Sequence, residues 1–501
     1  MNVFLMYKDR DFDVQAPLPW NAKELGQDLE LQTLLGAMSG DDKLVLEVCR
    51  RALLISETDV QAIVYRQRVL DDCLRHPQVI RELYGLGHEA IERRRKCSYG
   101  IFGRYPSAIL SGAIELLQVF SDLLRRLRGI AERNGATFTS EGFTSLFATL
   151  KRELSDEYLA LVAAQISELR LRSGALVSER LGDGNKAVDQ VLRRPKKRSG
   201  LLTRLREGPQ PSFSFRIADR DEGGARALGE MRDRGINPVA NALAQSADHI
   251  VSFFAMLRVE LAFYIGCLNL HEKFSGKGLP VCFPDPVEAD KRTHVFTGLY
   301  DACLALTLEG GVVGNNGQAD GKDLFIITGA NQGGKSTFLR SIGLAQLMTQ
   351  CGMYVAAERF RANICHGVFT HYRREEDASM KSGKFDEELS RMSGIVDHIS
   401  RSSLVLFNES FSATNEREGS QIARQIVAAL LDRGIKVLFV THMYELAHGF
   451  HDHGAAGAIF LRAERQSDGT RTFKLTEGEP LPTSFGRDLY ERIFEVAQEA
   501  R

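Results

Sequence analysis

Apolar positions between residues 21 and 180 recur at the three- and four-residue spacing of amphipathic helices. The pattern is clearest between residues 109 and 124, where leucine, isoleucine and phenylalanine fall on one helical face. Few glycines or prolines interrupt it, so the sequence predicts long helices that pack on one another. The simplest interpretation of this half is an all-helical scaffold without chemistry of its own.

The pattern changes near Leu181, where residues 182–185 predict a turn. Seven basic and no acidic residues follow between positions 193 and 206: Arg193, Arg194, Lys196, Lys197, Arg198, Arg204 and Arg206. Interspersed prolines and glycines predict a loop, and the alternation over 212–217 predicts a short strand. A solvated loop is the ordinary interpretation of such a segment. The functional alternative is an arm that contacts nucleic-acid phosphates.

A further long helix is predicted from Asn237-Pro238 to about Leu270, because proline is favoured in the first turn of a helix. Its apolar stripe suits a lever that lies on the next domain. A cluster of glycine and proline between residues 275 and 286 marks the boundary with that domain.

The residues from Leu324 to Ile327 form a short apolar run typical of a strand buried on both faces. The sequence that follows fits the phosphate-binding pattern GxxxxGK[ST], with Gly329, Gly334, Lys335 and Ser336, and leads into an apolar helix. In this loop, backbone N–H groups and the lysine bind phosphates while the Ser336 hydroxyl ligates Mg²⁺. The order strand, loop and helix predicts a nucleotide site.

Two further apolar runs end in polar residues that suit hydrolysis. The run 402–407 leads to Asn408-Glu409, and the run 437–440 leads to Thr441-His442. The first position usually carries an aspartate that holds Mg²⁺ through water, so the neutral Asn408 should hold the ion more weakly. Glu409 would polarise the attacking water, and His442 would sense the γ-phosphate.

The composition adds few constraints. The net charge is −1, so contact with nucleic acid would need local basic patches. We find no apolar run of the roughly 20 residues that cross a bilayer and no secretory signal, so no membrane association is expected. The 8 cysteines are scattered without a CxxC pair, which favours buried thiols in a reducing compartment and a cytoplasmic protein.

These motifs together resemble the MutS family of DNA-repair proteins. The phosphate loop of that family reads TG-x-N-x-GGKST, and it is matched by Thr328, Gly329, Asn331, Gly333, Gly334, Lys335, Ser336 and Thr337. Similar segments occur at 351–358, at 369–371 with 376–388, at 410–416, at 439–446 and at Ser484-Phe485-Gly486. Val312 or Val313 falls where the family offers an aromatic residue to the adenine.

The resemblance implies a multidomain chain, an all-α core and lever domain followed by an ABC-like α/β P-loop NTPase domain. The expected ranges are a helical core at 1–180, a basic loop and short strand forming a reduced clamp at 181–235, a lever helix at 236–280 and the ATPase domain at 281–501. ATP and Mg²⁺ are the expected cofactors, and a homodimer with composite ATP sites is the expected assembly. Catalysis would fall to Glu409, His442 and Lys335.

By this resemblance the protein binds DNA and couples ATP hydrolysis to clamp opening and closing in repair or recombination. The chain begins at the core without the aromatic wedge that reads mismatches, so we expect recognition of DNA structure and not of mismatches. Arg193, Arg194, Lys196, Lys197 and Arg198 are the candidate DNA contacts. The alternative, favoured by Asn408, is a nucleotide-gated scaffold with little hydrolysis that signals through a protein partner. A transporter ATPase is excluded by the lack of an LSGGQ signature.

Overall fold

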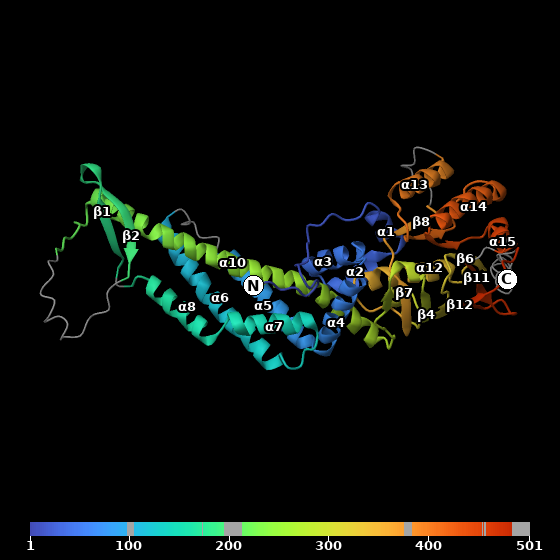
Figure 1. Cartoon of the computed structure of the whole chain (residues 1–501), viewed down its shortest axis with the longest axis horizontal. Coiled ribbons are helices and arrows are strands. Elements are labelled where there is room, and N and C mark those ends of the chain that lie inside the picture. The colour runs from blue at the N-terminus through green and yellow to red at the C-terminus, as the bar shows by residue number, and fades with distance from the viewer. Residues whose placement is uncertain are drawn as a thin grey trace, which may run out of the picture. The chain divides into compact units, whose positions relative to one another are not determined.

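The computed structural model describes residues 1–97, 105–172, 174–194, 213–374, 383–452, 454 and 457–482 of the chain (Figure 1). Packing divides these residues into two compact units. Unit 1 comprises Met1–Val3, Arg81–Phe138 and Phe143–Arg258, and unit 2 comprises Phe4–Ile80, Thr139–Gly142 and Val259–Arg501. The division follows packing, and the four domain ranges expected from the sequence stay predictions.

Unit 1 is mainly helical. Its elements are most of α5 (Pro77–Cys97), α6 (Pro106–Asn134), most of α7 (Glu141–Glu153), α8 (Asp156–Leu169), strands β1 (Leu176–Leu181) and β2 (Ala187–Arg193) with the short helix η1 (Asp183–Asn185) between them, and the first part of α10 (Glu222–Gly276). Helices α5 and α10 approach closely at Gly87, where a Cβ would lie 3.0 Å from the carbonyl oxygen of Phe254. A larger residue would force these two helices apart.

Unit 2 holds a second set of helices beside two sheets. The helices are α1 (Ala22–Asp28), α2 (Leu31–Ser39), α3 (Lys43–Leu54), α4 (Val60–Arg75), the end of α10, η2 (Ala289–Lys291), α11 (Ala302–Thr307), α12 (Lys335–Gln350), α13 (Lys384–His398), α14 (Glu416–Asp432) and α15 (Tyr444–Asp452). The smaller sheet has the order β3-β7-β4-β5 and is built from β3 (Asp285–Val287), β7 (Arg359–Asn363), β4 (His294–Leu299) and β5 (Asn315–Gln318).

The larger sheet has the strand order β12-β11-β6-β10-β9-β8. Its strands are β6 (Leu324–Gly329), β8 (Val368–Tyr372), β9 (Leu404–Asn408), β10 (Lys436–Val440), β11 (Ala458–Arg465) and β12 (Arg471–Glu477). All neighbours are parallel except β11 and β12. Strands β6 and β10 are buried along their whole length, which explains their uninterrupted apolar sequences. Their carboxyl ends meet at one edge of the sheet.

Several predicted elements are confirmed and others are wrong. The turn at 182–185 and the three buried strands before the predicted site are confirmed. The strand predicted at 212–217 is wrong for the described residues 213–217, which pair with no strand, and Phe213 is 95% exposed. The predicted loop begins too early, because Arg193 belongs to β2. Residues 176–180, predicted as helical, belong to β1 (Leu176–Leu181), which pairs with β2.

The predicted start of the long helix is also wrong. Helix α10 begins at Glu222, and Pro238 lies inside it. An internal proline costs about 3 kcal/mol because it removes a backbone hydrogen bond. The buried side chains of Ile236 and Ala240 on either side supply packing that offsets this cost.

Among the helices of the described residues, two, Pro106–Asn134 and Glu222–Gly276, are long and apolar enough to span a membrane by length and composition. Both helices were expected, but the sequence was interpreted as having no apolar run long enough to cross a bilayer. Half of the apolar window of the first and 67% of that of the second are buried inside the protein, as in core helices, so they are weak signals.

Candidate functional site

The phosphate-binding loop connects the end of β6 to the start of α12. Gly329 and Gly334 both adopt positive φ angles, of 108° and 87°, which side chains with a Cβ rarely adopt. A Cβ on Gly333 would lie 2.7 Å from the Cβ of Ala463 on β11. Glycine is therefore required at these positions by backbone conformation and by the adjacent strand. The loop leaves the first N–H groups of α12 at its open end, which is a favourable place for an anion.

Lys335 is buried at the first position of α12. Its Nζ donates to the carbonyl oxygens of Gly329 and Ala330, each at 3.0 Å. Burial lowers the pKa of Lys335 to about 8, an effect that the carboxylate of Glu409 partly opposes and Arg471 adds to. A bound anion would stabilise the protonated form of this lysine and so return its pKa toward its ordinary value.

Ser336 and Asn408 come from different elements and meet in front of the loop. The Ser336 Oγ donates to the Asn408 Oδ1 at 2.9 Å. Asn408 ends β9, and its register opposite Val440 and Tyr372 fixes where its side chain leaves the sheet. These two oxygens suit Mg²⁺, which takes oxygen ligands and keeps water and phosphate oxygens in its remaining positions. Both are neutral, so neither offsets the charge of the ion.

Glu409 and His442 form the third part of the site. The His442 Nε2 lies 2.7 Å from Glu409 Oε1. The hydrogen bond from His442 is the main cause that lowers the pKa of Glu409. Glu409 has a positive φ of 55°, an uncommon conformation that clusters at functional sites. Its backbone N–H donates to the carbonyl of Val440 at 2.9 Å, so the backbone of Glu409 is anchored to the strand that leads to His442.

The structure therefore brings Lys335, Ser336, Asn408, Glu409 and His442 to one edge of the sheet. The other predicted loop residues occupy the same segment. Asn331 lies in the turn, where its carbonyl oxygen accepts a hydrogen bond from Arg471 Nε at 3.3 Å. Thr337 lies half-buried in the first turn of α12.

Three residues beside the loop were missed in the sequence. Arg471 and Phe473 lie on β12, and Asn315 lies on β5. The Asn315 amide accepts from the N–H of Leu475 at 2.7 Å and donates to the carbonyl of Phe473 at 3.3 Å. The turn residues at 466–470 could have revealed the β11–β12 hairpin. Nothing in the sequence indicates that the hairpin reaches the loop.

Of the other segments that resemble the MutS family, the structure describes some and not others. His371 is a buried histidine whose Nδ1 lies 2.8 Å from Ser410 Oγ and whose ring stacks on Phe411, so it belongs to the core. Glu376, Asp377, Ser382 and Ser484-Phe485-Gly486 lie outside the described residues.

The basic segment is only partly described. Arg193 Nε donates to Ser178 Oγ at 2.8 Å, and Arg194 pairs with Glu168. Both arginine side chains are exposed. Lys196, Lys197 and Arg198 lie outside the described residues, so their DNA-contact assignment stays a prediction.

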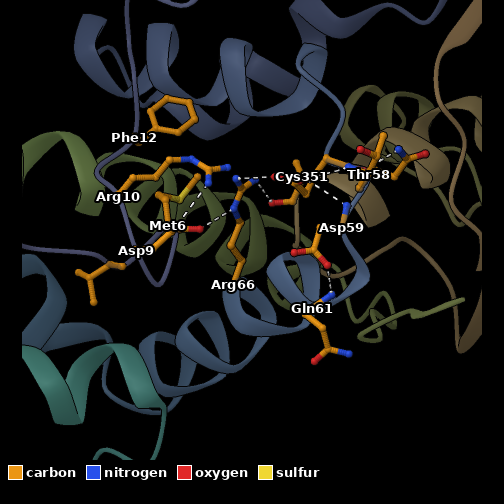
Figure 2. Close-up of polar contacts among 12 residues, drawn as sticks. Met6, Asp9, Arg10, Phe12, Thr58, Asp59, Gln61, Arg66 and Cys351 are labelled. Carbon is orange, nitrogen blue, oxygen red and sulfur yellow. Dashed lines mark hydrogen bonds and ion pairs between the residues drawn. The ribbon is translucent and has the colours of Figure 1, made fainter. Parts of the chain in front are cut away.

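Polar contacts join the far end of α12 to other parts of unit 2 (Figure 2). Arg66 of α4 is buried, and its guanidinium donates to the carbonyl of Met6 at 2.8 Å and to that of Cys351 at 3.4 Å. Tyr354, just beyond Cys351, donates to the carbonyl of Cys267 on α10 at 2.6 Å. The helix that carries Lys335 is thereby tied at its other end to α4 and α10.

The described part of the chain holds no group of three or more His, Cys, Asp or Glu side chains that could bind a metal ion. Of the described cysteines, Cys282 is half-buried and six others are buried, and none forms a disulfide. The prediction of buried thiols is therefore confirmed for these six cysteines. The side chain of Cys97 is not among those that the structure describes.

Comparison with known proteins gives two family matches. The MutS2 N-terminal domain matches residues 58–277, and MutS domain V matches residues 325–493. The chain is 32% identical over 204 residues to the DNA mismatch repair protein MutS of Desulforamulus reducens, which covers 37% of this chain and 24% of that protein. It is 34% identical over 151 residues to human MutS protein homolog 4, covering 30% of this chain and 16% of that protein. The chain thus spans about a quarter or less of the length of these relatives.

Proposed function

The chain belongs to the MutS family, and on that premise we propose that it is a DNA-binding ATPase that couples ATP binding and hydrolysis to movement of its helical part. The observation that carries the proposal is the meeting of Lys335, Ser336, Asn408, Glu409 and His442 at one edge of a parallel sheet. Each has a distinct place in phosphoryl transfer to water.

The phosphate-binding loop and Lys335 would bind the phosphates of the nucleotide. The backbone N–H groups at the start of α12 and the lysine ammonium hold the phosphates and neutralise their charge. For this, Lys335 exchanges its present bonds to two loop carbonyls for bonds to phosphate oxygens. Ser336 and Asn408 would hold Mg²⁺, which supplies charge neutralisation on the phosphate oxygens.

Glu409 and His442 would carry out the hydrolysis step. The Glu409 carboxylate is ionised at neutral pH, since its pKa is lowered, and it is able to orient a water molecule and accept its proton. The hydrogen bond from His442 fixes the orientation of that carboxylate. His442 acts on the reaction through Glu409, so it is a positioning residue. Hydrolysis changes the phosphate group beside this pair and would alter the contact between them.

Coupling would run through α12 to the lever. Lys335 begins this helix, and Gln350 ends it with hydrogen bonds at 2.8 Å to the carbonyls of Glu57 and Cys365. Arg66 and Tyr354 continue the connection to α4 and to the end of α10. Helix α10 contributes residues to both compact units. A displacement of α12 on nucleotide binding would therefore be transmitted to a helix that continues into unit 1.

DNA is the proposed partner because relatives that this chain is similar to are named as DNA mismatch repair proteins. We assign Arg193, Arg194, Lys196, Lys197 and Arg198 to the DNA backbone, and we propose a homodimer with composite ATP sites. A basic arm of this kind binds by counterion release, so affinity would fall steeply with salt.

The test is binding to homoduplex, mismatched and four-way-junction DNA in the presence of ATP, ADP or no nucleotide, over a salt series. The proposal expects affinity for at least one DNA form to depend on the nucleotide. Replacing the five basic residues by glutamine should reduce the slope of log affinity against log salt. Arg125→Gln and Arg152→Gln, at exposed arginines on α6 and α7, serve as controls for loss of surface charge elsewhere. A full salt slope in the five-residue variant rules out the arm.

The neutral Asn408 supports a second candidate, a scaffold that binds ATP, hydrolyses little and signals through a protein partner. That candidate predicts ATP-dependent DNA or partner binding without turnover. Measurement of phosphate release under the same conditions separates the two.

A further inference from the structure

Arg373 lies directly beside the hydrolysis residues and has no part in the function proposed so far. It follows Tyr372, the last residue of β8, which pairs with Asn408 at the end of β9. Its backbone N–H donates to the carbonyl of Asn408 at 2.9 Å. The side chain of Arg373 therefore starts next to Asn408 and Glu409, at the same edge of the sheet as the phosphate-binding loop.

Contacts on both sides hold the backbone at Arg373. Arg391 of α13 donates to the carbonyl of Tyr372 at 2.9 Å. Arg374 forms an ion pair with Asp28 at the end of α1, with 2.9 Å between Nη2 and Oδ1. These two arginines have structural partners. The point at which Arg373 leaves the sheet is thus fixed by contacts that do not use its own side chain.

The side chain of Arg373 is exposed, and its guanidinium forms no ion pair with any residue that the structure describes. Its charge nevertheless acts on the site. The hydrogen bond from His442 is the main cause that lowers the pKa of Glu409, and the charges of Lys335 and Arg373 lower it further. Burial raises the pKa of Glu388 on α13, and Arg373 is among the charges that oppose this effect. The guanidinium is therefore close to the carboxylate that would hold the attacking water.

The neutral side chain of Asn408 keeps this charge available. A carboxylate at that position would attract the neighbouring guanidinium of Arg373 and neutralise it. The amide of Asn408 forms no ion pair, so Arg373 can direct its charge to an anionic ligand. The site therefore lacks one negative charge that would hold the metal ion, and it has a cationic side chain of the protein at the same place.

We propose that Arg373 is a catalytic residue that binds the γ-phosphate of ATP and stabilises the negative charge on its oxygens during hydrolysis. This inference rests on the proposed ATPase function. A guanidinium offers paired N–H donors that match phosphate oxygens, and such a group stabilises the transition state of phosphoryl transfer. The oxygen of water bonds to the γ-phosphorus as the bond from that phosphorus to the oxygen of ADP breaks. Glu409 accepts the proton of the water, and Arg373 contributes charge without exchanging a proton.

The binding test compares the β,γ-imido analogue of ATP, which keeps a γ-phosphate and is not hydrolysed, with ADP. Both are titrated with Mg²⁺ in a calorimeter. Arg373→Gln should weaken binding of the analogue by roughly 10- to 100-fold, the effect of losing a charged hydrogen bond, and leave ADP binding unchanged. Unchanged ADP binding also demonstrates an intact loop. Arg373→Lys should retain part of the affinity, because an ammonium keeps the charge but not the paired donors.

The matched control is Arg433→Gln. Arg433 is exposed and precedes β10, so it lies at the opposite edge of the same sheet. This variant should bind both nucleotides as the unmodified protein does. In a turnover assay at saturating ATP, Arg373→Gln should lower kcat by roughly 100-fold or more, Arg373→Lys should lower it less, and Arg433→Gln should leave it unchanged.

The outcomes separate this inference from the proposed function. Unchanged affinity of Arg373→Gln for the analogue, an equal loss of ADP affinity, or an unchanged kcat would overturn the role of Arg373 while the ATP site stands. Failure of the unmodified protein to bind either nucleotide would overturn the ATP site and the inference together. If the unmodified protein binds the analogue but hydrolyses no ATP, the proposed ATPase and the catalytic role both fail.

Discussion

The Ser336 hydroxyl donates to the Asn408 amide oxygen at 2.9 Å, and so joins the start of α12 to the end of β9. In the proposed function these two oxygens hold Mg²⁺. A carboxylate in place of the amide would add a negative charge at the same position. The ion would then be held more tightly, because hard cations prefer charged oxygen ligands.

Asn408→Asp is therefore expected to lower the Mg²⁺ concentration for half-maximal turnover by roughly tenfold, a change of about 1.4 kcal/mol. The measurement is the ATP hydrolysis rate against free Mg²⁺ at saturating ATP. Asn415→Asp is the matched control, since Asn415 caps α14 through its side-chain oxygen and aspartate caps equally well. An unchanged midpoint in Asn408→Asp would mean that this residue does not contact the metal.

The lowered pKa of Lys335 leads us to expect that nucleotide affinity depends on pH. Burial lowers its pKa to about 8 in the free protein, and bound phosphate would raise it. Binding should then take up a proton above pH 8, and affinity should be highest below pH 8 and fall as pH rises through that value. Calorimetry in two buffers of different ionisation enthalpy measures the uptake.

The control for this experiment is Lys335→Arg, because a guanidinium stays protonated at these pH values. Proton uptake at pH 8.5 should disappear in that variant. Uptake that persists there would assign the titration to another group.

The sequence was informative about the phosphate site because its parts are local. Leu324 to Lys335 reads as strand, loop and helix within a dozen residues, and the strand ends at Asn408 and His442 follow buried apolar runs. Parallel strands bring such ends together at one edge of a sheet. Their order alone therefore predicted which side chains meet.

The features that escaped prediction depend on distant contacts. Arg471 reaches the carbonyl of Asn331 across 140 positions of the chain, and the irregular pairing of β12 with β11 between Arg471 and Leu475 has no signal in residue type. Helix α10 continues through Pro238 because buried neighbours outweigh the local cost of proline. Local propensity cannot register packing of this kind.

Arg66 is expected to be among the most sensitive positions for stability. Its guanidinium is 1% exposed, and it satisfies the carbonyls of Met6 and Cys351 while lying 4.3 Å from the centre of the Tyr7 ring. Arg66→Met should lower the free energy of unfolding by about 2–4 kcal/mol, because buried acceptors lose their donors. Urea denaturation measures the change.

Arg75→Met on the same helix is the control. Its ion pair with Asp71 is exposed, and such pairs contribute less than about 1 kcal/mol. Equal stability losses in the two variants would show that Arg66 has no special role.

The raised pKa of Glu260 leads us to expect that the free energy of unfolding depends on pH. Its carboxylate accepts from the N–H groups of Leu5, Met6 and Phe12 at the start of the chain. Burial nevertheless raises its pKa to about 7, with these three bonds acting in the opposite direction. A carboxyl with a raised pKa stabilises the folded state in its protonated form, so its contribution should fall by about 3 kcal/mol as pH rises from 4.5 to 7.

Comparison with Glu260→Gln isolates that contribution. The amide does not titrate, so its unfolding free energy should vary less between pH 4.5 and 7 than that of the unmodified protein. The variant should also be less stable at pH 4.5, because an NH₂ group cannot accept from the backbone N–H groups. Parallel pH profiles for the two proteins would contradict the assignment.

The most direct test of the central claim is steady-state ATP hydrolysis with Mg²⁺, with and without DNA, using Glu409→Gln as the blank. Glutamine preserves the shape of Glu409 but cannot accept a proton from water. The proposed function predicts a rate roughly 100-fold or more above the blank, and a rate that at least one form of DNA changes. A rate equal to that of the blank with every DNA would contradict the ATPase and leave the nucleotide-gated scaffold.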